Sequence, residues 1–158
     1  GMILISGIQV MKGYLNDEEK TSKVLKIINS KIYYITGDKG KIDEDGFLTI
    51  VDRYSRFAKL GGEMISLGII EEKISKLIDL EENNLVDFII TTIEDDKKGE
   101  KIILLISHVN EEYISLLKEK ILNSFENKLM IPSNIKIIDE VPRLGSGKKD
   151  FAKAKLLV

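Results

Sequence analysis

The sequence predicts an α+β fold in which helices pack on a small sheet. From residue 55 onward, segments with apolar residues at helical spacing and short β-branched runs follow in the order helix, two strands, helix, strand, loop, helix. The composition of 43% hydrophobic and 32% charged residues is typical of a globular chain. A length of 158 residues suits one domain, or a small domain with part of another.

The leading segment differs, because its short strands and single helix do not supply a core of their own. The first elements expected there are a strand over Ile3–Met11 and a helix capped by Asn16, with Val24, Leu25 and Ile28 on its buried side. A strand over Ile32–Thr36 that stops at Gly37, a hairpin turn over Asp43–Gly46 and a strand over Phe47–Val51 follow. We therefore expect residues 2–54 and residues 55–158 to form separate domains.

The second segment has stronger periodicity. It begins with a strand over Phe57–Leu60 and a helix that Ser66 caps, followed by strands over Leu85–Thr92 and Lys101–His108. A helix that Asn110 caps, a strand over Ile135–Asp139, a loop over Pro142–Asp150 and a short basic helix complete the unit. The residues that the two capped helices are expected to bury are Ile70, Ile74, Leu77 and Ile78 in the first, and Ile114, Leu117, Ile121 and Phe125 in the second.

The composition excludes several classes of function. The 24 Lys and Arg residues nearly balance 26 Asp and Glu residues, which removes the electrostatic case for nucleic acid or an anionic membrane as the main partner. Without cysteine there is no disulfide framework, thiolate metal site or cysteine nucleophile. His108 alone cannot make a multi-histidine metal site, and its place on an apolar strand favours a structural role. Apolar runs such as Ile102–Ile106 are too short to span a bilayer, so we expect no membrane span and a cytoplasmic location.

The tetrapeptide Gly145-Ser146-Gly147-Lys148 is only superficially a phosphate loop. Pro142 stands where the first glycine of the Walker spacing is required, and Lys149 stands where a serine or threonine is required. What remains is a glycine-flanked lysine on an exposed loop, which can place a point charge on an anionic oxygen. A solvated turn is the alternative interpretation.

Other charged residues also allow two interpretations. The acidic run Asp43–Gly46 is a hairpin turn rather than a calcium loop, because Lys41 occupies the first ligand position. Asp38 follows a strand and a glycine, where a carboxylate can accept both hydroxyls of a ribose or can simply belong to a turn. The last charged cluster fits either an acidic partner or a solvated helix face, and its members are Lys148, Lys149, Lys153 and Lys155.

Arginine is rare in this chain. Only Arg53, Arg56 and Arg143 interrupt a set of basic residues that is otherwise lysine. Each was retained either for its planar, fork-like donor geometry or by chance.

Several short motifs recur in a characteristic order: Gly13-Tyr14-Leu15, Thr36-Gly37-Asp38, Asp43 to Leu48, Asp52-Arg53, Lys59, Gly62-Glu63 and Pro142 to Asp150. Over essentially the whole chain they resemble the C-terminal portion of the acyl- and aryl-adenylate-forming enzymes. The segments Arg56–Lys59, Gly62–Leu67 and Leu144–Phe151 resemble most the acyl-[acyl-carrier-protein] synthetase part of bifunctional 2-acylglycerophosphoethanolamine acyltransferases. The resemblance implies a small lid domain, with helices on a mainly antiparallel sheet, preceded by a β-rich remnant of the large N-terminal adenylation domain.

The resemblance implies two half-reactions. A fatty carboxylate attacks the α-phosphate of Mg-ATP to give acyl-AMP and pyrophosphate. The thiol of a phosphopantetheine arm, on acyl carrier protein or coenzyme A, then takes the acyl group and releases AMP. ATP and Mg²⁺ serve the complete enzyme, and we expect neither to bind tightly to this chain.

The resemblance also implies roles for single residues. For the nucleotide, it implies that Asp38 binds the ribose hydroxyls, that Arg53 lies beside Asp38 or near the phosphate, and that Lys148 is the catalytic lysine that bridges carboxylate and phosphate oxygens. It places Ser55 at the hinge on which the lid rotates. For the thiol donor, it places Gly62 and Lys59 at the pantetheine tunnel and brings Lys153 and Lys155 into contact with the carrier protein. Ser55 departs from the usual Asp or Lys at the hinge, and Asp52 departs from the usual glycine before the arginine.

The nucleotide loop, the magnesium contacts and the acyl pocket of such enzymes belong to the large domain, and this sequence lacks them. We therefore expect the chain to be inactive alone, as a fragment or a natural partial gene that needs the missing domain as partner. The alternatives are a non-catalytic module that docks acyl carrier protein or a ligase partner, and a degraded coding fragment. Strands within residues 2–52 lack neighbours, so we expect a homo-oligomer through their edges, or disorder there. The complete protein is expected to associate with membranes where an acyltransferase is fused upstream.

Overall fold

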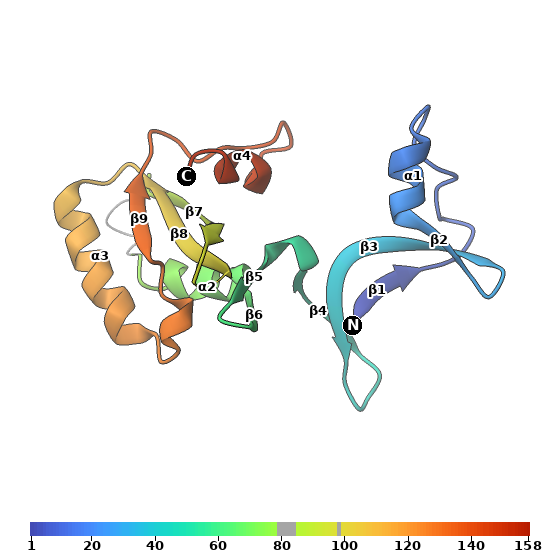
Figure 1. Cartoon of the computed structure of the whole chain (residues 1–158), viewed down its shortest axis with the longest axis horizontal. Helices are drawn as coiled ribbons and strands as arrows, with labels where there is room; N and C mark the ends of the chain where they lie inside the picture. Colours follow the sequence, from blue (N-terminus) through green and yellow to red (C-terminus); the bar gives the residue numbers. More distant parts are fainter. Residues whose placement is uncertain (79–84, 98) are drawn as a thin grey trace. The chain divides into compact units, whose positions relative to one another are not determined.

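The computed structural model describes residues 1–78, 85–97 and 99–158 of the chain. These residues form two compact units, Gly1–Arg56 and Phe57–Val158 (Figure 1). The units divide two residues beyond the boundary that the sequence patterns indicate. Each unit has its own sheet.

A five-stranded sheet organises the second unit. β7 (Asp87–Asp95) and β8 (Gly99–Ser107) pair antiparallel along their whole length, and β9 (Asn134–Ile137) runs parallel to β8. β5 (Phe57–Leu60) meets the beginning of β8, and β6 (Glu63–Ser66) pairs antiparallel with β5. The α+β fold with a mainly antiparallel sheet is therefore confirmed.

Both faces of this sheet are covered, because successive residues of a strand point to opposite sides. Leu104 lies in the larger core, together with buried residues of α2 (Leu67–Ser75) and α3 (Glu111–Ser124). The next residue, Leu105, lies in a smaller core with residues of α4 (Phe151–Lys155). β8 is consequently apolar without interruption over residues 102–106, as expected for a strand buried on both faces.

The two long helices of this unit begin where the sequence predicts. The Ser66 hydroxyl accepts a hydrogen bond from the Ile69 N–H, and the Asn110 side chain accepts one from the Tyr113 N–H. These caps satisfy N–H groups that have no partner in the first helical turn. Seven of the eight expected core residues are buried, namely Ile70, Ile74, Ile78, Ile114, Leu117, Ile121 and Phe125. Leu77 is only partly buried and packs against this core.

The first unit is a four-stranded antiparallel sheet with one short helix. Its strands are β1 (Met2–Ile5), β2 (Leu25–Ile28), β3 (Lys31–Ile42) and β4 (Leu48–Arg53), its helix is α1 (Glu18–Val24), and a 3₁₀ turn, η1 (Tyr54–Arg56), ends the unit. β3 pairs with all three other strands and curves through the unit in Figure 1. The hairpin turn between β3 and β4 is confirmed, because the Asp43 side chain accepts hydrogen bonds from the Asp45 and Phe47 N–H groups.

Four details of the leading segment are wrong in the prediction. β1 ends at Ile5, where a turn begins in which the Val10 N–H donates to the Gly7 carbonyl. The cap of α1 is Asp17, because Asn16 has a φ of +54° and stands outside the helix. The helix stops at Val24, and Leu25–Ile28 forms β2 instead of continuing its buried side. β3 runs on past Gly37 to Ile42, because β4 supplies a partner for its second half.

Two details of the second unit also differ. β6 was not expected, since Glu63–Ser66 has too few residues for a clear alternation. His108 follows β8 instead of lying on it, and it is exposed with a φ of +60°. Its environment is therefore a turn, and it has no structural role in the core.

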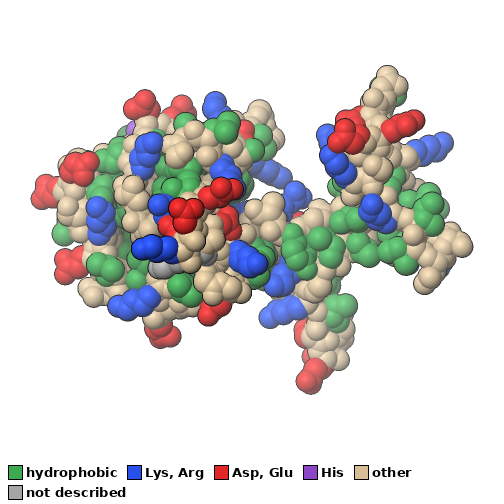
Figure 2. Space-filling model, in the orientation of Figure 1, with side chains coloured by type: hydrophobic (Ala, Val, Ile, Leu, Met, Phe, Trp, Pro, Cys, Tyr) green, Lys and Arg blue, Asp and Glu red, His purple; other side chains and the backbone are tan. Residues whose placement is uncertain are grey.

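The first unit carries almost no core. Gly40 is its only buried residue, and all 56 residues of the unit are described. Figure 2 shows apolar side chains at its surface, and the exposed ones include Ile8, Ile27, Ile42, Phe47 and Ile50. An uncovered apolar sheet of this size is typical of a surface that another chain or domain covers.

Among the described residues, no helix has both the length and the apolar character that crossing a bilayer requires.

Candidate functional site

The segment Pro142–Asp150, here called the lysine loop, is a small hairpin. Its base is closed by a 2.8 Å hydrogen bond from the Asp150 N–H to the Pro142 carbonyl. Two further bonds of 2.8 Å close its tip, from the Leu144 N–H to the Lys148 carbonyl and from the Gly147 N–H to the Leu144 carbonyl. Gly147 has a φ of +81°, a conformation that a glycine adopts without strain. The backbone on both sides of Lys148 is therefore fixed.

Both ends of the lysine loop are anchored in the smaller core. Val141, just before the loop, is 1% exposed, and Ala154, just after it, is fully buried. The Asp150 side chain accepts a hydrogen bond from the Lys153 N–H and so begins α4 directly after the loop. The anchors place the loop at the edge of the face that α4 covers.

Asp87, the first residue of β7, holds the lysine loop from outside. Its Oδ2 lies 2.5 Å from Nη2 of Arg143, and its Oδ1 lies 3.9 Å from Nζ of Lys149. The same arginine donates from Nη1 to the Gly147 carbonyl at 2.7 Å. Lys149 also places its Nζ 4.5 Å from the centre of the Phe88 ring. Sequence reasoning missed Asp87, because 56 residues separate it from Arg143 and no local pattern marks it.

Lys148 is exposed, whereas its neighbour Lys149 is held against Asp87 and Phe88. Arg143 and Lys149 lie opposite each other in the hairpin, and Lys148 lies in the bend just before Lys149. Within the described part of the chain, the Lys148 ammonium has no ion-pair or hydrogen-bond partner. It is a positive charge available to an anionic ligand.

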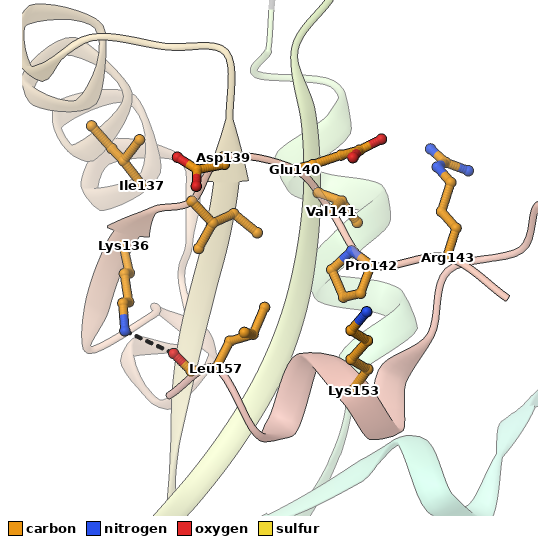
Figure 3. A pocket seen from close by; sticks show the side chains of 10 residues that line it. Lys136, Ile137, Asp139, Glu140, Val141, Pro142, Arg143, Lys153 and Leu157 are labelled. Atoms are coloured by element: carbon orange, nitrogen blue, oxygen red, sulfur yellow. Dashed lines mark hydrogen bonds between the residues drawn. The ribbon is translucent and has the colours of Figure 1, made fainter.

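A groove of about 630 Å³ borders the base of the lysine loop (Figure 3). Pro142 and Arg143 line one part of it, and Lys153 of α4 points into it from another. Lys136 closes the far end by donating from Nζ to the Leu157 carbonyl at 2.7 Å. The lining is mixed: three cations, two carboxylates (Asp139 and Glu140) and five apolar residues contribute to it.

Asp38 and Arg53 are brought together in the first unit. They lie opposite each other in the β3–β4 pair, and Nε of Arg53 is 3.0 Å from Oδ1 of Asp38. The Asp38 N–H donates to the Thr36 hydroxyl, which itself donates to the Ile3 carbonyl. The sequence suggested that Asp38 follows a strand, but the residue lies within β3. Its carboxylate retains a second oxygen with which to accept further hydrogen bonds.

Ser55 lies in η1, at the end of the first unit, and is exposed. The turn follows Asp52, whose Oδ1 accepts a hydrogen bond from the Arg53 N–H and lies 4.0 Å from Nη1 of Arg56. The Asp52 side chain is only 8% exposed. The Asp52 carboxylate is thus part of the local structure around Ser55.

Lys59 and Gly62 belong to the β5–β6 hairpin. Gly61 and Gly62 have φ values of +58° and +92°, as a two-residue hairpin turn requires. A Cβ added to Gly62 would meet no atom within 4 Å, so crowding inside this chain does not explain the glycine. The Lys59 N–H donates to Oε2 of Glu100, whose other oxygen accepts from the Thr92 hydroxyl, so the hairpin is tied to the sheet.

The lysine cluster at the end of the chain divides in two. Lys148, Lys153 and Lys155 are exposed, whereas Lys149 is half-buried against Asp87. The described residues contain no group of three His, Cys, Asp or Glu side chains that could hold a metal ion.

Comparisons with known proteins extend over nearly the entire chain. No profile of a protein family matches it. It is 31% identical to 4-coumarate--CoA ligase 2 of Nicotiana tabacum over 99% of its own length and 28% of that protein. Its structure resembles ATP-bound MatB from Rhodopseudomonas palustris with a TM-score of 0.79 at 24% identity, over 99% of this chain and 30% of that one.

The chain has the fold of the small C-terminal domain of adenylate-forming enzymes. A second structure supports this, that of o-succinylbenzoate CoA synthetase (MenE) from Bacillus subtilis in complex with an acyl-adenylate intermediate. The TM-score is 0.72 at 26% identity, over 98% of this chain and 30% of MenE. The chain thus spans less than a third of the length of the CoA ligases that it matches.

Proposed function

We propose that this chain is the C-terminal part of an ATP-dependent fatty acid–thiol ligase. The observation that carries the proposal is the lysine loop, which presents the exposed ammonium of Lys148 on a backbone fixed by three hydrogen bonds. The similarity to CoA ligases over nearly the whole chain supports it.

Lys148 acts in the first half-reaction. The substrate carboxylate attacks the α-phosphorus of ATP, the bond to the bridging oxygen of pyrophosphate breaks, and acyl-AMP forms. Negative charge accumulates on the phosphate oxygens during this step, and a positioned ammonium stabilises it. Mg²⁺ would neutralise the departing pyrophosphate from the large domain, since the described residues here contain no cluster of metal ligands.

Asp38 holds the nucleotide in this proposal. Its free carboxylate oxygen accepts the ribose hydroxyls, while Arg53 neutralises the other oxygen from 3.0 Å away. Arg53 is 65% exposed, so its remaining N–H groups can also reach a phosphate.

The second half-reaction uses a different surface of the small domain, and Ser55 is the proposed hinge. The thiolate of the pantetheine arm attacks the acyl carbon and AMP leaves as the carbon–oxygen bond breaks. We place Gly62 and Lys59 beside the arm, because the space where a side chain of Gly62 would begin is open to a ligand: a Cβ added there would meet no atom of this chain within 4 Å. Lys153 and Lys155 are exposed cations for the acidic surface of acyl carrier protein, which we propose as thiol donor, with coenzyme A as the other candidate.

The first unit supplies the contact with the large adenylation domain. Its sheet has apolar side chains on the surface and a single buried residue, so it needs a cover. We propose that the large adenylation domain covers it in the cytoplasm, and that self-association takes its place in the isolated chain.

Complementation tests the enzymatic proposal. The large domain of a related ligase is mixed with this chain, and ATP–pyrophosphate exchange is measured with fatty acids and with aromatic acids such as 4-coumarate. We expect exchange with fatty acids, reduced about 10²–10³-fold by Lys148→Ala, as for the loss of one charge-stabilising contact. Lys120→Ala, an exposed lysine of α3, is the matched control. Full exchange with Lys148→Ala contradicts the role of this lysine.

The second candidate function is a non-catalytic module that docks acyl carrier protein. The exposed cations Lys153 and Lys155 favour it. Titration of the chain with acyl carrier protein should then give binding that weakens with salt and with Lys153→Glu and Lys155→Glu, but not with Lys120→Glu. Binding that ignores both changes counts against this function.

A further inference from the structure

The Asp87–Arg143 pair links the lysine loop to the sheet. Asp87 belongs to a strand whose neighbouring residues are buried, so its position is fixed by the core. Arg143 lies near the base of the lysine loop, and its two terminal nitrogens donate hydrogen bonds to two different acceptors. Nη2 donates to the Asp87 carboxylate, while Nη1 donates to the Gly147 carbonyl next to Lys148.

This double contact connects the sheet with the backbone at Lys148. A guanidinium can make both bonds at once because its donors lie in a rigid plane, whereas a lysine ammonium cannot span the two acceptors in this way. Lys149 places a second cation near the same Asp87 carboxylate, and its Nζ also lies over the Phe88 ring. These two contacts hold the backbone at Lys149, the residue directly after Lys148, against β7. Lys148 has no such contacts of its own, so its direction depends on these neighbours.

We infer that Asp87 and Arg143 are positioning residues that hold Lys148 toward its anionic ligand. The inference rests on the proposed function for the identity of that ligand. The contacts of Arg143 with the Asp87 carboxylate and the Gly147 carbonyl, here called the brace, are a property of this chain alone. Arg143, one of only three arginines, is then retained for its fork geometry.

The brace is tested on the chain by itself, through hydrogen exchange of backbone amides. Arg143→Ala should speed exchange of the Leu144 and Gly147 N–H groups about 10- to 100-fold, the range expected for loss of a charged hydrogen bond. Arg143→Lys should give an intermediate increase, because it keeps the ion pair and loses the fork. The amide of Leu104 should not change, which separates this effect from unfolding. Lys76→Ala, which breaks an ion pair on α2, is the matched control.

A double-mutant cycle in the complemented enzyme tests whether the brace acts through Lys148. Arg143→Ala and Asp87→Asn should lower kcat for ATP–pyrophosphate exchange about tenfold or more with little change in the KM for ATP. Adding Arg143→Ala to Lys148→Ala should cause no further loss, whereas a merely structural arginine would lower both backgrounds equally. Equal losses in the two backgrounds overturn the inference. Unchanged hydrogen-exchange rates of the Leu144 and Gly147 amides in Arg143→Ala also overturn it. If Arg143→Ala speeds hydrogen exchange in the loop but Lys148→Ala keeps full activity, only the proposed function is overturned.

Discussion

Arg53 and Asp38 face each other across the β3–β4 pair, with the arginine Nε 3.0 Å from one carboxylate oxygen. Both residues stand on a sheet rather than a loop, and the contact leaves one Asp38 oxygen unoccupied by Arg53. The pair is thus ordered before any ligand arrives.

Asp38→Asn should raise the KM for ATP in the complemented enzyme about 10- to 100-fold, since a charged acceptor of the ribose hydroxyls is lost. The KM for the carboxylic acid should stay constant. Steady-state ATP–pyrophosphate exchange measures both constants, and Asp45→Asn, in the exposed hairpin turn, is the control. An unchanged KM for ATP would show that Asp38 does not contact the nucleotide.

Adjacent leucines of α3 provide a test of the larger core. Leu117 is 2% exposed, whereas Leu116 is 56% exposed. Leu117→Ala should lower the free energy of unfolding by about 2–5 kcal/mol, because it removes buried methyl groups and leaves a cavity. Leu116→Ala should change it by less than about 1 kcal/mol. Urea unfolding followed by circular dichroism compares them, and similar losses would mean that α3 packs differently.

Gly62→Ala should destabilise the β5–β6 hairpin by about 1–2 kcal/mol through backbone strain, since Gly62 has a φ of +92°. Gly62→Asn should cost less, because asparagine tolerates this conformation better. Gly145→Ala, which has open space and no positive φ, should be nearly neutral. Thermal unfolding ranks the three variants. If Gly62→Ala and Gly145→Ala unfold together, the hairpin does not have this turn.

Glu72 and Lys76 predict a pH dependence on α2. The hydrogen bond from Lys76, at 2.6 Å, and the charge of its ammonium hold the pKa of the exposed Glu72 carboxyl below its ordinary value. The folded-state pKa is lowered, so the contribution of the pair is present above the ordinary carboxyl pKa and is lost as pH falls through the lowered one. Lys76→Met should therefore raise the pKa of Glu72 toward the ordinary value in a carboxyl NMR titration. Lys23→Met, which breaks the equivalent pair with Glu19, should leave it unchanged.

The helices of the second unit were predictable because the residues that define them interact with near neighbours in the sequence. A capping side chain followed by apolar residues at helical spacing requires only local contacts, and both Ser66 and Asn110 obey this rule. The first unit obeyed it less well. Leu25 and Ile28 suit a helix or a strand, and pairing with β3 decides for the strand. β3 passes Gly37 for the same reason, since β4 provides a partner beyond it.

The sequence singles out part of the proposed site. It points to Lys148 through its glycine-flanked loop and to Asp38 through its place beside a glycine, and the structure shows that Lys148 is exposed and that Asp38 pairs with Arg53. The brace on the loop was not, because Asp87 acquires its role only when β7 comes to lie beside residues far along the chain. Lys149 illustrates the same point, since the sequence groups it with exposed lysines and the fold places it against Phe88.

The burial of Val141 and Ala154 on either side of the lysine loop has a thermodynamic consequence. Fixing the backbone of one residue costs roughly 1–2 kcal/mol in conformational entropy, which a mobile loop would lose each time it closed on a ligand. Here the folding of the core has already ordered that backbone. In the proposed function, ligand binding then restricts mainly the rotamers of the Lys148 side chain, and the loop does not refold each time an anion binds and leaves.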